Sequence, residues 1–296
     1  MVEILRGMEA RVSNDMNEVI IQPFTADEVK LAISQMYPYK FPGPDGMSLV
    51  FDQKYWHIVG PKVISFVLDF LNHGQFDVKL NYTYIVLISK CVSPKNMSHF
   101  RPISLYNITY KIVSEMLANR LKPILSSIIS ESQSVFLPDN VLVAYDLNHY
   151  LAYKTWDSVG HTTLKLDLSK VYDQVEWIFL ERVLIRFNFH PRFISLLISC
   201  VPTLSYSLML DSQKFDYSHP QWGCRHGNPL SLYLFLFCAK ALSHLLTRGK
   251  RMGSCMVWRL VVRVFGCLIC SSQMTSNFFP SYGGGHALCE AGTARI

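Results

Sequence analysis

Asp167 ends a short apolar stretch, "LKLDL" at residues 164–168, and a carboxylate in that position could bind a divalent metal ion. One carboxylate is not a metal site, so the chemistry depends on where its partner lies. An aspartate at the end of a strand also commonly caps the following turn, and the stretch alone favours neither role. Asp173 has capping-box spacing with Glu176, which predicts that Asp173 is the N-cap of the next helix.

Cationic and aromatic residues lie on either side of this stretch. Lys90 and Arg101 flank a turn-rich loop, where two cations would suit a polyanion, although isolated residues of this kind are usually solvated surface charges. Tyr172 follows Asp167 closely, and its simplest interpretation is a buried aromatic at a helix start. In "RHGNP" at residues 225–229, Asn228 is suited to cap a long apolar helix that follows the glycine turn.

The elements that must position these residues can be predicted from periodicity and caps. Thr25 and Glu28 form a capping box that opens an apolar-striped helix. Helices flanking a few strands, with one hairpin, indicate an α+β fold. We predict a helix from Pro61 to a stop at Gly74, a strand at 83–89, a helix at 108–125, a strand at 162–168, helices at 175–187 and 192–201, a hairpin at 205–218 and a helix from 229.

Composition sets broad limits on the class of protein. The chain has 296 residues, 50% of them hydrophobic, which is enough for a large core. Its formal charge of +6 favours an anionic partner such as nucleic acid but is common in other proteins. There is no signal-peptide pattern and no uncharged apolar run that could span a bilayer, and the eight cysteines are scattered. We therefore expect an intracellular protein, nuclear or cytoplasmic, with free thiols and no membrane partner.

Five blocks in a fixed order resemble the reverse transcriptases of non-LTR retrotransposons (long interspersed elements), especially the plant type. The resemblance covers about Asn14 to Leu246 and rests on "PFTADEVKLAISQMYPYKFPGPDG", "FRPISLYNITYKIVSEMLANRLKPIL", "SESQSVFLPDN", "LKLDLSKVYDQVEW" and "RHGNPLSLYLF". It implies a right-hand polymerase fold: an N-terminal extension and the start of the fingers at 1–98, fingers at 99–160 and a partial palm at 161–247. The C-terminal palm hairpin and the thumb are expected to be missing.

The resemblance also implies an activity, RNA-directed DNA polymerisation, and a role for each matching residue. The substrates would be an RNA template, a DNA primer and deoxynucleotides, with Mg²⁺ as the metal. Asp167 matches the first metal-binding carboxylate, and Tyr172 matches the aromatic residue that crowds a ribose 2′-hydroxyl. Lys90 and Arg101 match finger residues that reach the triphosphate, and His226 and Gly227 fall in the loop near nucleotide and template. The resemblance does not define the oligomeric state.

Departures from the family cluster where function should be strictest. His226 stands where the family has a glutamine, and Val171 replaces a small alanine beside the catalytic strand. A basic Gly-Arg segment usual in the family is lacking between Pro138 and Asp139. The remaining departures are Phe41, Gln174, Trp222, Cys224, Asn228 and Leu232.

The family's second carboxylate site reads Phe-Ala-Asp-Asp, yet no Asp-Asp pair occurs in this chain. Met274 is encoded only by ATG and Thr275 begins with AC, so the overlapping codon between them is GAC, aspartate. Permitted codons extend this other frame to Ser-His-Leu-Phe-Phe-Ala-Asp-Asp across Cys267 to Thr275. We infer a frameshift between about Arg248 and Gly266, an out-of-frame tail at 248–296 with little packed structure, and an inactive chain.

The tail permits a second interpretation. It holds a C-x-x-C and an H-x-x-C, whose spacing is compatible with tetrahedral zinc: Cys255, Cys267, Cys270, His286 and Cys289. A random translation from a cysteine-rich frame explains the same residues without zinc. The alternative function is accordingly a non-catalytic nucleic-acid-binding protein that uses the basic finger surface or this tail.

Overall fold

The structure is a computed structural model that describes residues 5, 7–74, 81–129, 161–165, 171–210, 213–251 and 269–273. The chain divides into two compact units. The first unit comprises Met1–Ile128 and Tyr172–Ala241, and the second comprises Ile129–Val171 and Leu242–Ile296.

Four helices form the N-terminal part of the first unit: α1 (Asn14–Ile20), α2 (Ala26–Gln35), α3 (Leu49–Lys54) and α4 (Trp56–His73). The predicted capping box of α2 is confirmed, since Thr25 and Glu28 each bond the other's backbone N–H. The predicted stop of α4 is also confirmed, with Gly74 at a left-handed φ of 76°.

The predicted start of α4 at Pro61 is wrong, because the helix begins at Trp56 and Pro61 lies inside it. The reason is local packing: a Cβ on Gly60 would come within 2.8 Å of the Trp56 ring. The Trp56 indole therefore packs close to the Gly60 backbone, a contact inside the helix that the proline signal does not reveal.

Helix α5 (Ile108–Ile128), as predicted from its periodicity, packs its buried face against α2 and α4. Arg120 connects α5 to the end of α1 and the start of α2. Its Nε donates to Oε1 of Glu28 at 2.8 Å, its Nη1 donates to the Ile20 carbonyl at 2.9 Å, and its guanidinium lies 3.4 Å from the Phe24 ring centroid. Burial raises the pKa of Glu28, but hydrogen bonds from Arg120 and Thr25 outweigh it and hold that pKa below its ordinary value.

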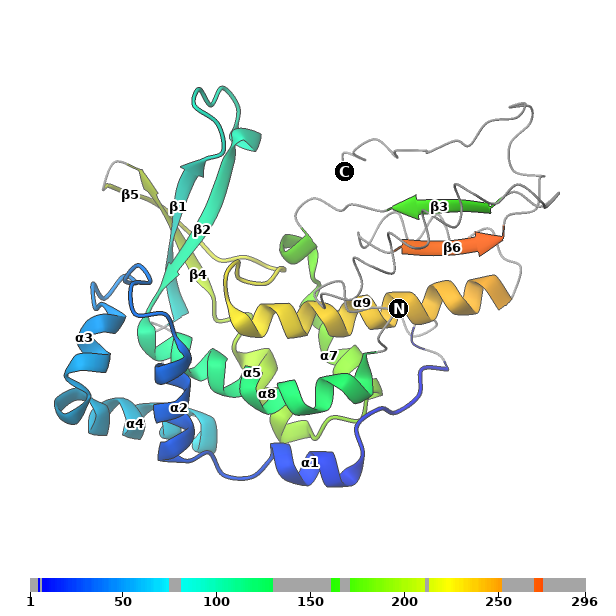
Figure 1. The fold of residues 1–296 in the computed structure, drawn as a ribbon, viewed down its shortest axis with the longest axis horizontal. Helices are drawn as coiled ribbons and strands as arrows, with labels where there is room; N and C mark the ends of the chain where they lie inside the picture. Colours follow the sequence, from blue (N-terminus) through cyan, green and yellow to red (C-terminus); the bar gives the residue numbers. More distant parts are fainter. Residues whose placement is uncertain are drawn as a thin grey trace. The chain divides into compact units, whose positions relative to one another are not determined.

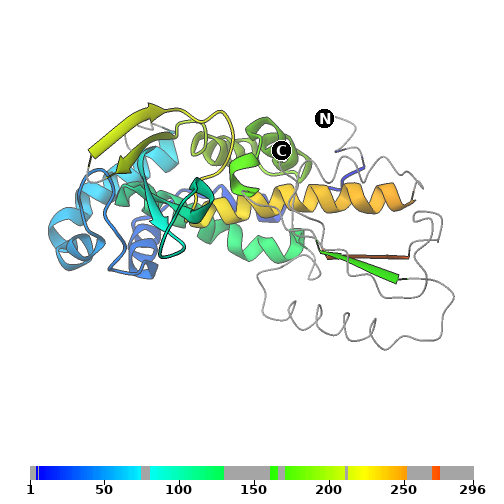
Figure 2. The same ribbon diagram turned by 90° about the horizontal axis from the view of Figure 1, so that it is seen from above.

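A four-stranded sheet stands at one end of these helices in Figure 1, in the strand order β2-β1-β4-β5. Its strands are β1 (Tyr82–Ser89), β2 (Phe100–Tyr106), β4 (Ser205–Leu210) and β5 (Gln213–Ser218). The pairs β1–β2 and β4–β5 are antiparallel hairpins, and β1–β4 is parallel. Figure 2 shows the β4–β5 pair from above. The predicted strand at 83–89 and the hairpin at 205–218 are confirmed.

Three further helices follow in the described residues: α7 (Trp177–Arg186), α8 (Pro191–Ser199) and α9 (Pro229–Arg251). Phe237 of α9 packs in an aromatic core with Phe187 and Phe189. Its ring centroid lies 6.1 Å from that of Phe187 and 5.4 Å from that of Phe189. Asn228 caps α9 as predicted, its Oδ1 accepting from the Leu230 N–H at 3.0 Å.

In the second unit, strand β3 (His161–Lys165) pairs antiparallel with β6 (Ile269–Gln273), and Leu164 lies opposite Cys270. β3 overlaps the strand predicted at 162–168 over residues 162–165, and the remaining residues of that prediction lie outside the described residues. The mixed α/β composition agrees with a polymerase fingers-and-palm domain. The boundaries proposed at 98, 160 and 247, the missing hairpin and thumb, and the poor packing of the tail stay predictions.

Candidate functional site

A short 3-10 helix, η4 (Val171–Gln174), and the glycine loop at residues 223–228 are joined by backbone hydrogen bonds. The Gly223 N–H donates to the Val175 carbonyl at 2.8 Å, and the Cys224 N–H donates to the Tyr172 carbonyl at 2.6 Å. Gly223 has a φ of 95°, and a Cβ there would lie 3.1 Å from the Asp173 carbonyl oxygen. Only glycine therefore allows the two segments to approach this closely.

Tyr172 and His226, two residues predicted for the nucleotide site, come together at this junction. Their ring centroids lie 5.7 Å apart, edge to face, and the Tyr172 ring also lies 5.4 Å from that of Phe235. Asp173 Oδ1 lies 2.7 Å from His226 Nε2, in a pair that is an ion pair when the imidazole is protonated. Both side chains are partly exposed, so the group faces solvent and can meet a ligand.

The predicted N-cap role of Asp173 is wrong. The N-cap of α7 is Glu176, with no side-chain capping bond, and the Asp173 carboxylate pairs with His226 instead. The physical reason is the backbone bond from Gly223 to Val175. That bond belongs to the loop contact and delays the helix to Trp177, whose indole Nε1 donates to the Gly223 carbonyl at 2.8 Å.

Arg225 is a functional candidate that the sequence reasoning missed. It is only 3% exposed, and its guanidinium carbon lies 4.4 Å from the Tyr106 ring centroid and 4.2 Å from that of Tyr110. Nη2 donates to the Asn81 carbonyl at 3.0 Å and to the Asn81 side-chain oxygen. In the described residues its Nε and Nη1 are buried without a hydrogen-bond acceptor. The signal was available, because Arg225 is a residue of the "RHGNP" block that agrees with the family.

The surroundings of Arg225 explain why it holds the loop. Burial raises the pKa of Tyr106 to about 12, with the Arg225 charge opposing the rise, so the phenol stays a neutral donor. Its hydroxyl donates to the Gly227 carbonyl at 3.2 Å. Gly227, predicted as part of the site, has a φ of 74° and is exposed. The buried Arg225 and Tyr106 therefore hold the inner side of the loop, while Gly227 is exposed to solvent.

Lys90 and Arg101 lie on the β1–β2 hairpin, at its outer part, and both are exposed. The Lys90 N–H and Nζ donate to the carbonyls of His99 at 2.8 Å and Ser98 at 3.0 Å. Arg101 stands opposite Ile88 in the strand register. Within the described residues, no hydrogen bond or ion pair joins either cation to Tyr172 or His226, so the structure leaves their predicted convergence on a triphosphate untested.

Asp167, the central residue of the prediction, lies outside the described residues. So do Pro138, Cys255, Cys267, His286 and Cys289, while Cys270 falls in β6. The described part of the chain contains no group of three or more His, Cys, Asp or Glu side chains that could hold a metal ion. The residues that the structure describes therefore do not build a magnesium site.

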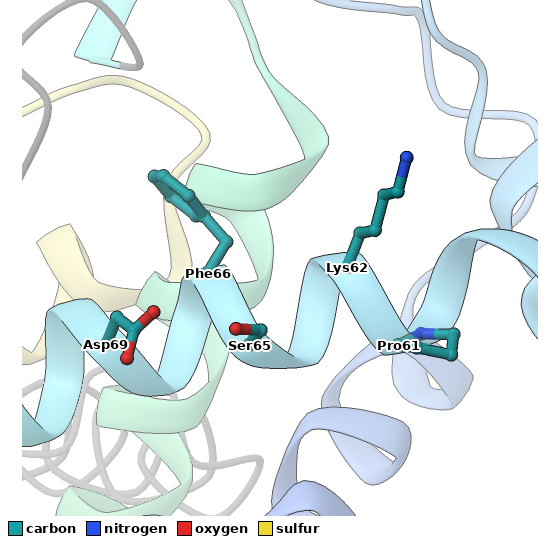
Figure 3. Close-up of a pocket in the computed structure, with 5 residues that line it drawn as sticks. All are labelled: Pro61, Lys62, Ser65, Phe66 and Asp69. Atoms are coloured by element: carbon teal, nitrogen blue, oxygen red, sulfur yellow. The ribbon is translucent and has the colours of Figure 1, made fainter.

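A shallow hollow of another kind lies along α4 (Figure 3). Its five lining residues, Pro61, Lys62, Ser65, Phe66 and Asp69, come from this single helix, and Figure 3 shows their side chains diverging along it. Groups that bind a substrate converge from several elements. This hollow is therefore a surface feature and not a second active site.

Comparison with known proteins identifies the class. Residues 93–258, more than half of the chain, match the family described as reverse transcriptase (RNA-dependent DNA polymerase). The chain belongs to this reverse transcriptase family. It is also similar to the "Transposon TX1 uncharacterized 149 kDa protein" of Xenopus laevis, with 29% identity over 235 residues, 76% of this chain, and this similarity supports the non-LTR retrotransposon type. The chain spans 17% of the length of that relative. In the described residues no helix is long and apolar enough to cross a membrane.

Proposed function

We propose that this reverse transcriptase domain, of the plant non-LTR type, keeps the surfaces that hold an RNA template, a DNA primer and a deoxynucleotide but does not extend the primer. The observation that carries the proposal is the absence of any Asp-Asp pair from the full sequence. Family members hold two magnesium ions between the first carboxylate and this pair. Asp167 has no such partner in this chain.

The loss of catalysis is expected on electrostatic grounds. Phosphoryl transfer requires an ionised primer 3′-hydroxyl and a neutralised leaving pyrophosphate, and paired metal ions supply both. Removing one preorganised charged group commonly lowers a rate by about 10²–10³-fold, and losing a carboxylate pair removes more than one such group. With Asp167 alone, we expect magnesium to bind weakly and the hydroxyl to stay protonated.

A shifted reading frame after about Arg248 explains how the pair was lost. The family match ends at residue 258, inside the interval 248–266 where we place the shift. In addition, β6 of the tail pairs with β3, the strand that leads toward Asp167. The second carboxylate pair would have to come from a neighbouring strand of this kind. Sequencing the coding DNA tests the account, which fails if the other frame lacks Phe-Ala-Asp-Asp.

The nucleotide-binding part of the proposal rests on the junction between η4 and the glycine loop. Tyr172, held between His226 and Phe235, is proposed to stand against the sugar of the deoxynucleotide. Lys90 and Arg101 are proposed to reach its triphosphate from the hairpin, because both are exposed cations. His226 replaces the family's neutral glutamine, so it brings a titratable side chain to the template side of the site.

Magnesium-dependent primer extension on an RNA template tests the proposal, with the chain as given and an Asp167→Ala variant. We expect no extension above background from either protein. The same samples should retain RNA binding that weakens as salt rises. Extension by the chain as given that disappears in Asp167→Ala would overturn the inactivity proposal, because it would show a working metal site.

A further inference from the structure

One face of the four-stranded sheet carries a row of aromatic rings that spans three strands. Tyr82 and Tyr84 of β1 lie two residues apart, so both side chains point to the same face, and their rings are 5.3 Å apart. The ring of Tyr217 on β5 lies 5.8 Å from Tyr82 and 4.8 Å from the ring of His219. We call the set Tyr82, Tyr84, Lys214, Tyr217 and His219 the aromatic face.

The strand between the two aromatic strands explains how the rings meet. β4 places Ser205 opposite Tyr82 and Ser207 opposite Tyr84. Both serines are small and buried, so the rings of β1 and β5 can close over them. The Tyr82 hydroxyl donates to Ser207 Oγ at 2.7 Å, which fixes the ring in place. The face is therefore preorganised, which lowers the entropic cost of binding.

Cations border the same face. Lys214 Nζ lies 4.9 Å from the centroid of the Tyr84 ring, and the lysine is exposed. Arg101 of β2 stands opposite Ile88, and Ile88 shares a face with Tyr84 because the strand period is two. Tyr217 itself is 61% exposed and His219 is exposed as well. The surface thus combines half-buried tyrosine rings on β1 and an exposed tyrosine ring on β5 with exposed positive charge.

We propose that the aromatic face binds single-stranded nucleic acid, with bases stacked on Tyr84 and Tyr217 and phosphates near Lys214 and Arg101. Every base has a ring face, and stacking on an aromatic side chain contributes about 1–3 kcal/mol per base. A nucleic acid strand offers both kinds of group that this face can bind, base rings for the tyrosines and phosphates for the exposed Lys214 and Arg101.

The inference rests on the proposed function in one respect, that the bound strand is the unpaired part of the template. Arg101, proposed to reach the nucleotide, lies on the same face as Tyr84, so a strand stacked on the rings would lead toward the nucleotide. The binding itself requires no catalysis. It can therefore be measured in a chain that does not extend primers.

The test uses fluorescence anisotropy of the full chain with a labelled oligouridine RNA and a DNA strand of equal length. Tyr217→Leu removes a stacking ring that is mostly exposed, so folding should be unaffected. Phe215→Leu is the matched control, because Phe215 is also on β5 and is 47% exposed. It pairs with Leu208, which alternates with Ser207 and so points to the opposite face, and the register shift between Tyr206 and Leu208 accounts for Tyr217 lying on the aromatic face. Equal thermal unfolding of the two variants establishes that any difference lies in binding.

We expect Tyr217→Leu to raise the dissociation constant for RNA by about 5- to 150-fold, and Phe215→Leu to leave it within about twofold. Lys214→Gln should reduce the slope of log affinity against log salt by about 1. Loss of RNA and DNA binding together supports stacking alone, and loss for RNA only supports stacking with a 2′-hydroxyl contact. Equal RNA affinities of the two leucine variants would overturn the proposal for the aromatic face. The proposed function would stand, because the template would then bind at another surface of the chain. A wild-type chain that binds neither strand would overturn both.

Discussion

The buried cations of the first unit and the exposed cations of the β1–β2 hairpin differ in their contacts. Arg225 lies between two tyrosine rings and Lys111 donates its Nζ to the Phe41 carbonyl at 2.9 Å, both from buried positions. Lys90 and Arg101 are exposed and, apart from the contacts of Lys90 within its own hairpin, available to a ligand. Buried positive charge in this protein thus holds neighbouring segments together, whereas the exposed positive charge of the hairpin is proposed to contact the nucleotide.

Removing Arg225 should have the largest effect on stability. Arg225→Ala abolishes two cation–ring contacts and the hydrogen bonds to Asn81, so we expect a loss of about 3 kcal/mol of unfolding free energy. Urea unfolding measures it. An Arg225→Lys variant should recover less than half, because an ammonium cannot lie flat between two rings. A loss no larger than that of Arg101→Ala would show that the buried and exposed cations are equivalent.

The buried Lys111 should make the free energy of unfolding depend on pH. Burial lowers its pKa to about 8 from an ordinary 10.5, so between pH 8 and 10.5 the unfolded chain binds more protons than the folded chain. Stability should therefore rise with pH across this window. Lys111→Met should lack that rise, and the difference between the two unfolding curves isolates it from other titrating groups. Parallel curves for the two proteins would contradict the buried placement of Lys111.

The pair between Asp173 and His226 should contribute little to stability, although it joins η4 to the glycine loop. Both side chains are partly exposed, so water screens the interaction. A double-mutant cycle with Asp173→Asn and His226→Gln should give a coupling free energy below about 1 kcal/mol. A coupling free energy of about 3 kcal/mol or more would show that this pair contributes as much to stability as the buried Arg225.

The smallest stability effect is expected at the hairpin. Lys90→Ala and Arg101→Ala should each change the unfolding free energy by less than about 0.5 kcal/mol, since both residues are exposed. The same substitutions should weaken binding of a deoxynucleoside triphosphate by roughly tenfold, because each removes a charge-assisted hydrogen bond. Titration of the triphosphate into the full chain checks this. Unchanged affinity in both variants would remove these two residues from the site.

Features set by neighbouring residues could be predicted from the sequence. The Thr25–Glu28 capping box, the left-handed stop at Gly74 and the Asn228 cap each depend on residues within one turn. The hairpin at 205–218 follows from two short alternating runs. The Pro61 start failed because a packing contact between Trp56 and Gly60 outweighed the proline signal.

Contacts between distant segments could not be predicted in this way. Arg225 reaches Asn81 across 144 positions, and Tyr106 reaches Gly227 across 121. Periodicity carries no information at that separation, so the buried arginine looked like one more basic residue in a loop. The same limit produced the wrong role for Asp173, whose partner His226 is 53 positions away. Tyr172 and His226 were predicted only through resemblance to the family.

We propose that this domain binds its substrates but lost catalysis with its reading frame. The direct measurement is the rate of magnesium-dependent primer extension by the chain as given and by a chain whose frame is restored after Arg248. We predict background rates for the first and, if His226 and the shortened segment at Pro138 are tolerated, extension by the second that Asp167→Ala abolishes. Equal extension by both chains, abolished in each by Asp167→Ala, would contradict the claim.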